Sequence, residues 1–192
     1  MGIIVLSIQG LPPKGGKFDG VAMYSNGKPI VAIASSKKGP AWLAFYLAHE
    51  LGHISLEHVK PDGGMCVDAD LANAGVDEDT EEQEANGFAL ELLTGEATGI
   101  TFESSSLKAP EVGKAALKFA SKADPKIDPG VVVLSYCKST GYWGVAKKAL
   151  EIVGQSEGGH EKVRQVLLQH LDSKRISESE ARFLAATCHL PL

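Results

Sequence analysis

The sequence lacks the features that define several large classes of protein. Its longest apolar runs fall far short of the roughly 20 residues that a membrane-spanning helix needs, so we expect no contact with a membrane. The three cysteines, Cys66, Cys137 and Cys188, are far apart and form no C-x-x-C pair, which argues against a disulfide framework and a zinc ribbon. The first residues lack the basic segment and cleavage site of a secretory signal. The sequence therefore predicts a cytoplasmic protein with free thiols.

Basic charge is also scarce. The chain has 19 Lys and Arg against 24 Asp and Glu, and its net charge is −5. This balance provides no electrostatic footprint for unaided binding to DNA or RNA, so we expect no direct nucleic-acid binding. With 192 residues, of which 44% are hydrophobic, the chain has the composition of a globular protein and is long enough to bury a core.

The most informative pattern present is H-E-x-x-H at residues 49 to 53. Positions i and i+4 lie on the same face of a helix, so His49 and His53 can reach one zinc ion while Glu50 stands beside the open coordination position. The aromatic and apolar residues that follow Gly39-Pro40 predict a helix continuing to about His58. This is the arrangement of a zinc hydrolase.

A second, acidic helix is predicted over residues 80 to 94, and it offers the third ligand that such a site requires. Glu82, Ala85 and Ala89 share one face of this helix by their spacing. A carboxylate on a packing face is costly unless it is paired or binds a metal. We therefore expect Glu82 to be the third ligand, with Glu84 taking that role if the helix phase is shifted.

Other polar residues are candidates for further roles at the site. A tetrahedral intermediate needs a donor for its oxyanion, and the sequence leaves four candidates open, Tyr46, Tyr142, His160 and His170. The offset of His58 from the H-E-x-x-H histidines turns it away from the metal face, so we interpret it as a helix-end or surface residue.

The remaining pattern predicts an α+β fold. Residues 3–8, 20–24 and 29–34 are rich in Val and Ile, and Asn26-Gly27 predicts a tight hairpin between the last two strands. Residues 61–79 read as a polar loop, and five helices are predicted at 109–121, 129–139, 142–153, 160–172 and 177–189. We expect a small N-terminal antiparallel sheet packed on the H-E-x-x-H helix and the acidic helix, followed by a C-terminal helical bundle.

The ordered pair of motifs resembles the ImmA/IrrE family of gluzincin-like, repressor-cleaving zinc metallopeptidases. The resemblance rests on F-x-L-A-H-E-L-G-H at residues 45–53 and E-x-x-A-N-x-F-A at residues 82–89. It covers roughly residues 1–95 and implies that these form the metallopeptidase core. From the length of the chain we expect one domain, with residues 96–192 as a helical part packed with that core. The chain departs from the family at Leu92-Leu93-Thr94-Gly95, where members typically have L-L-M-P.

The resemblance also implies roles for the site residues. His49, His53 and Glu82 would bind one Zn²⁺, and Glu50 would be the general base. The implied activity is an intracellular endopeptidase that makes limited cuts in a regulatory protein, a helix-turn-helix transcriptional repressor. The alternative is a non-catalytic metal-binding sensor or protein-interaction module on the same fold. Intact Glu50 favours the enzyme, because a pure binding site does not need a base there.

Overall fold

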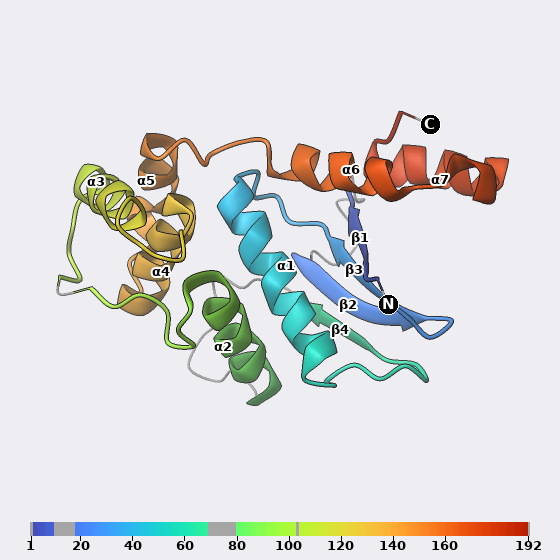
Figure 1. Ribbon diagram of the computed structural model, residues 1–192, viewed down its shortest axis with the longest axis horizontal. Coiled ribbons are helices and arrows are strands. Elements are labelled where there is room, and N and C mark those ends of the chain that lie inside the picture. Colours follow the sequence, from blue (N-terminus) through green and yellow to red (C-terminus); the bar gives the residue numbers. More distant parts are fainter. Residues whose placement is uncertain (1, 10–17, 69–79, 103, 192) are drawn as a thin grey trace.

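The computed structural model describes residues 2–9, 18–68, 80–102 and 104–191, and it confirms the predicted α+β class (Figure 1). The strands are β1 (Ile4–Ser7), β2 (Gly20–Ser25), β3 (Lys28–Ile33) and β4 (Met65–Asp68). The helices are α1 (Pro40–Ser55), α2 (Thr80–Thr94), α3 (Ala109–Ala120), α4 (Pro129–Thr140), α5 (Ala146–Ile152), α6 (Gly159–His170) and α7 (Glu178–Cys188), with short 3-10 helices η1 (Trp143–Val145) and η2 (Ser173–Arg175).

The four strands form one sheet in the order β1-β3-β2-β4. Strands β2 and β3 are an antiparallel hairpin, and its turn residues Asn26 and Gly27 have φ of 50° and 69°, as the Asn-Gly signal predicted. Strand β1 pairs in parallel with β3, so the sheet is mixed and the expectation of an antiparallel sheet was wrong. The reason is that β4 occupies the outer edge of β2, and β1 pairs with the remaining edge, that of β3.

Strand β4 corrects a second expectation, because it lies within the predicted loop of residues 61–79. It pairs antiparallel with β2, and Cys66 is opposite Ala22. The neighbours Met65 and Val67 are 63% and 51% exposed, whereas Cys66 is half-buried. Alternation along the strand thus directs Cys66 to the face opposite its neighbours. A four-residue strand with two exposed apolar residues has no hydrophobic pattern that sequence reasoning could detect. The rest of the predicted loop, residues 69–79, lies outside the described ranges.

Helix α1 is the centre of the molecule. It packs against β2, β3, α2, α4 and α6, and Figure 1 shows it lying between the sheet on one side and helices α2 to α5 on the other. Because it is covered on most sides, both its apolar residues and its H-E-x-x-H motif are buried. The helix ends at Ser55, three residues before the predicted end, and Glu57 follows with a φ of 62°. This left-handed residue turns the chain back toward the helix.

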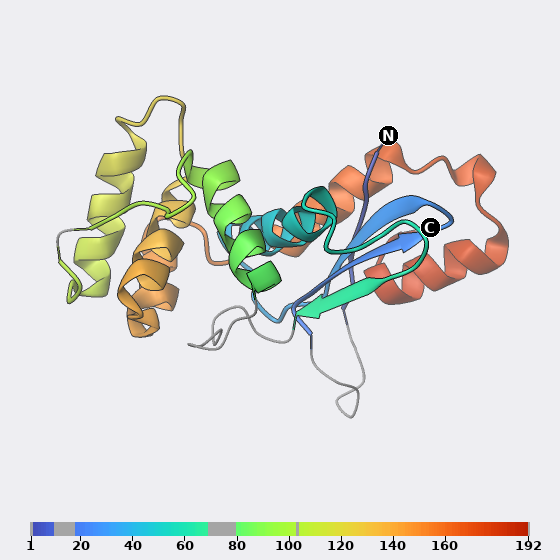
Figure 2. The same cartoon turned by 90° about the horizontal axis from the view of Figure 1, so that it is seen from below.

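The C-terminal helices do not form one bundle, which corrects the sequence-based expectation. Helices α3, α4 and α5 pack together, with α4 against α1 and α2, whereas α6 packs against β1 and α1. The two groups lie at opposite ends of the molecule (Figures 1 and 2). The main core joins α1 to the first group; for example, Trp42 stacks on Trp143 with ring centroids 5.5 Å apart. Within the described ranges, no helix combines the length and apolar character of a membrane span.

Candidate metal centre

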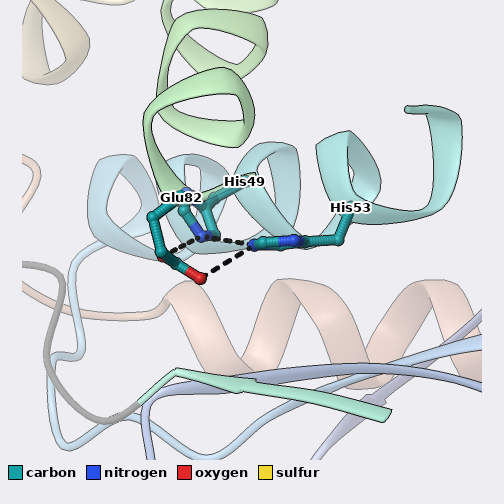
Figure 3. A group of neighbouring side chains, drawn as sticks. All are labelled: His49, His53 and Glu82. Atoms are coloured by element: carbon teal, nitrogen blue, oxygen red, sulfur yellow. Dashed lines mark hydrogen bonds and ion pairs between the residues drawn. The ribbon is translucent and has the colours of Figure 1, made fainter. Parts of the chain in front are cut away.

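Three side chains that the sequence singled out meet at one point. The Nε2 atoms of His49 and His53, one turn apart on α1, are 3.0 Å apart, and both side chains are fully buried. Glu82 lies in the first turn of α2, with Oε2 3.3 Å from His49 Nε2 and Oε1 3.5 Å from His53 Nε2. Figure 3 shows the two rings and the carboxylate converging. Glu84, the alternative third ligand predicted from the sequence, contacts His58 instead.

These separations fit a shared metal ion. Two ligands about 2.0–2.1 Å from one tetrahedral ion are roughly 3.3 Å from each other, and the observed separations of 3.0, 3.3 and 3.5 Å surround that value. The three ligand atoms all lie within 4.8 Å of one another. His49, His53 and Glu82 are therefore positioned to bind a metal ion.

Small residues at the contact between α1 and α2 bring Glu82 within reach. Ala85 and Ala89 are fully buried, which confirms the close approach expected from their spacing. Gly52 is the partner that the sequence analysis missed: a Cβ there would lie 3.1 Å from Ala85 Cα and 3.2 Å from its carbonyl oxygen. Its position between the two motif histidines, facing the acidic helix, was a signal that could have been used. A larger residue at position 52 would push the helices apart and move Glu82 away from the histidines.

Glu50 extends from α1 toward the first residue of β2 in the sheet. Its side chain is fully buried, and its carboxylate lies against the first residue of β2, Gly20. A Cβ at position 20 would come within 1.8 Å of Glu50 Oε1, so only glycine leaves room for the carboxylate. Gly20 is two residues before Ala22, the cross-strand partner of Cys66, which places all three on the same face of the sheet. The glycine was not recognised from the sequence.

Of the two alternatives predicted for His58, a helix-end or a surface residue, the first is confirmed: His58 lies just after the end of α1 and is not on the surface. Its Nδ1 is 3.1 Å from Nδ1 of His53, its Nε2 is 3.0 Å from Oε2 of Glu84, and its side chain is only 6% exposed. These contacts follow from the early end of α1, after which Glu57 returns the chain to the helix. One set of tautomers satisfies both contacts of His58: its Nε2–H donates to Glu84, and its Nδ1 accepts from His53 Nδ1–H. This leaves His53 Nε2 with its lone pair directed at the metal position.

Cys66 also lies at the centre, and sequence reasoning did not predict this. Its Sγ is 3.8 Å from His53 Nε2, and its S–H donates to Glu82 Oε1 at 3.9 Å. The other two thiols are buried: burial raises the pKa of Cys137 to about 12, and Cys188 is 1% exposed. Cys66 could be recognised only once β4 was known to be a strand beside β2.

Of the four candidates for an oxyanion donor, His160 has both ring nitrogens in contact with other polar groups. Its Nδ1 is 2.8 Å from Ser7 Oγ, and its Nε2 is 3.1 Å and 3.0 Å from the carbonyl oxygens of Ser35 and Lys37. Burial lowers its pKa, and these carbonyls oppose that effect. His160 thus fastens α6 to β1 and to the segment before α1. It is a structural residue.

The other three candidates differ in their burial and in their position. Tyr46 is fully buried on α1 and stacks on Trp42, with ring centroids 5.9 Å apart. Tyr142 is 46% exposed, just after α4. His170 is an exposed residue at the end of α6, where its Nδ1 lies 2.8 Å from the carbonyl oxygen of Val166.

In comparisons with known proteins, no family model matches the chain and no curated protein matches it significantly. The resemblance to the ImmA/IrrE metallopeptidases therefore rests on the two motifs alone.

Proposed function

We propose that this protein is a zinc-dependent endopeptidase. The observation that carries the proposal is the convergence of His49, His53 and Glu82, together with the burial of Glu50, which follows His49 on α1. Two imidazoles and one carboxylate are the ligand set of zinc hydrolases, in which three protein ligands leave one position for water or substrate. The same nitrogen and oxygen donors favour zinc over the hard cations Mg²⁺ and Ca²⁺.

The residues of the site would have separate roles in hydrolysis. When bound, the metal ion would polarise the scissile carbonyl and acidify the attacking water. Glu50 would accept the proton of that water and deliver it to the leaving amine. Gly20 would leave room for the Glu50 carboxylate at the sheet face, and His58 would orient the ring of His53.

The proposed substrate is a regulatory protein, a transcriptional repressor of the helix-turn-helix class, cut at a limited number of bonds in the cytoplasm. This part rests on the resemblance of the two motifs to the ImmA/IrrE metallopeptidases. The chain's net charge of −5 supports action through a protein partner in place of direct binding to DNA.

The test separates metal binding from hydrolysis. Glu50 is not among the three metal ligands, so Glu50→Gln should retain zinc at the wild-type affinity while losing cleavage of the repressor. Zinc content by metal analysis and cleavage by mass spectrometry measure the two properties. Equal cleavage by the wild type and by Glu50→Gln would remove the peptidase proposal.

A metal-binding sensor is the second candidate, and Cys66 is the observation that favours it. Structural zinc sites are closed by four protein ligands, whereas catalytic sites keep one position open. The Cys66 Sγ lies 3.8 Å from His53 Nε2, close enough for the thiol to act as a fourth ligand.

A further inference from the structure

We infer that Cys66 is a fourth ligand of the ion held by His49, His53 and Glu82, and that its thiolate closes the site in the resting protein. Ligation by Cys66 rests on the metal centre alone. The regulatory consequence, that Cys66 must leave before a peptide bond can be cut, rests on the proposed peptidase function.

Distance is the first argument. A sulfur 2.3 Å from a tetrahedral zinc ion lies roughly 3.5–3.6 Å from nitrogen or oxygen ligands at about 2.0–2.1 Å. Cys66 Sγ is 3.8 Å from His53 Nε2 and 3.9 Å from Glu82 Oε1, within a few tenths of an ångström of that geometry. The sulfur thus already stands at ligand spacing from two of the three proposed ligands.

The second argument is the register of β4. Cys66 pairs with Ala22, which is fully buried, so the thiol emerges on the face of the sheet that α1 covers. Its neighbours Met65 and Val67 are exposed on the opposite face. A shift of one residue in this register would remove the thiol from the centre. Strand β4 therefore delivers one side chain, a good zinc ligand, to the metal position.

The third argument is that the thiolate can also leave. Cys66 lies on the outer strand of the sheet, which has a free edge among the described elements, and its side chain is half-buried. An extended peptide that pairs with an exposed sheet edge is a common mode of recognition. A substrate bound along β4 would run past Cys66, and a small movement of this strand would exchange the thiolate for water. Four ligands close the site, and three open it.

Cobalt-substituted protein provides the direct test, because a thiolate bound to Co²⁺ produces a sulfur-to-metal charge-transfer band in the near ultraviolet. We expect the band in the wild type and in Cys188→Ala, the matched control, and not in Cys66→Ala or Cys66→Ser. Zinc affinity in both Cys66 variants should fall by more than the roughly 10- to 100-fold typical of an outer-shell partner. An absent band in the wild type, or unchanged zinc affinity in both Cys66 variants, would overturn the inference.

Alkylation adds a readout that does not need a variant. Iodoacetamide reacts with the thiolate, whose sulfur bonds to the reagent's methylene carbon while iodide leaves. Zinc should protect Cys66 by at least tenfold in rate, as a bound thiolate is a poor nucleophile. The same modification rate with and without zinc would contradict ligation.

Peptide hydrolysis then separates the inference from the proposed function. If Cys66→Ala at saturating zinc cuts peptides faster than the wild type, both the ligation by Cys66 and the peptidase function are supported. A Cys66-dependent cobalt band with no hydrolysis by either protein keeps the fourth ligand and contradicts the peptidase. Hydrolysis that depends on Glu50, with no Cys66-dependent band, keeps the peptidase and removes the inference.

Discussion

Glu50 and Gly20 occupy the same small space between α1 and the sheet: a Cβ at position 20 would lie 1.8 Å from Glu50 Oε1. The conflict is with the end of a flexible side chain, so Gly20→Ala should fold and the carboxylate should move. Metal affinity should stay at the wild-type value, because Glu50 is not a proposed ligand. Hydrolysis should fall by at least about 100-fold, since general-base catalysis contributes roughly 10²–10⁴-fold. Wild-type hydrolysis by Gly20→Ala would show that the position of Glu50 is immaterial.

The two histidines of α1 should each be required for metal binding. His49→Ala and His53→Ala should each weaken zinc affinity by more than about 100-fold, because each removes a directly coordinating nitrogen. Competition with a chelator measures the affinity, and far-UV circular dichroism confirms that the variants fold. His170→Ala, which removes an exposed histidine, is the control. Retention of wild-type affinity in both site variants would refute the centre.

Substitutions of the α2 carboxylates should affect zinc affinity to different degrees, according to the distance of each carboxylate from the ion. Glu82→Ala should weaken zinc affinity by more than about 100-fold, whereas Glu81→Ala should leave it nearly unchanged. His58→Ala should fall between them, at roughly 10- to 100-fold, because His58 holds the ring of His53. Glu84→Ala should have a smaller effect than His58→Ala, since the Glu84 side chain is 56% exposed. An effect of Glu84→Ala larger than that of Glu82→Ala would exchange their roles.

Sequence reasoning succeeded where a residue's position follows from spacing along one helix. His49 and His53 share a face of α1 by their i, i+4 spacing, and Glu82 shares a face with two alanines of α2. The Asn-Gly turn between β2 and β3 was also predicted, because its chemistry is local.

It failed where a residue's position depends on contacts between distant segments. Cys66 reaches the centre only because β4 pairs with β2, and a four-residue strand leaves no periodic signal. His58 reaches His53 only because α1 ends at Ser55, and the end of a helix is among the least certain features of a sequence. The parallel position of β1 depends on which sheet edges the other strands leave open.

His160 should make folding stability depend on pH. Burial lowers its pKa below the ordinary 6.5, so the folded protein favours the neutral ring. As pH falls below about 6.5 the unfolded chain takes up a proton before the folded protein does, and the stability from neutral His160, complete above that pH, is progressively lost. His160→Gln should lower the free energy of unfolding by roughly 1–3 kcal/mol at about pH 8, and this difference should shrink toward pH 5. Denaturant titrations of metal-free protein measure it. A difference that is constant with pH would contradict the assignment.

The central claim is that Glu50 performs hydrolysis beside a metal ion held by His49, His53 and Glu82. The most direct measurement incubates zinc-loaded protein with a defined library of synthetic peptides and detects new termini by mass spectrometry. It compares wild type with Glu50→Gln, each with Cys66 intact and with Cys66→Ala. The account predicts new termini from proteins that retain Glu50, more of them with Cys66→Ala, and none from either Glu50→Gln protein. No new termini from Cys66→Ala with Glu50 intact, or equal cleavage after Glu50→Gln, would contradict it.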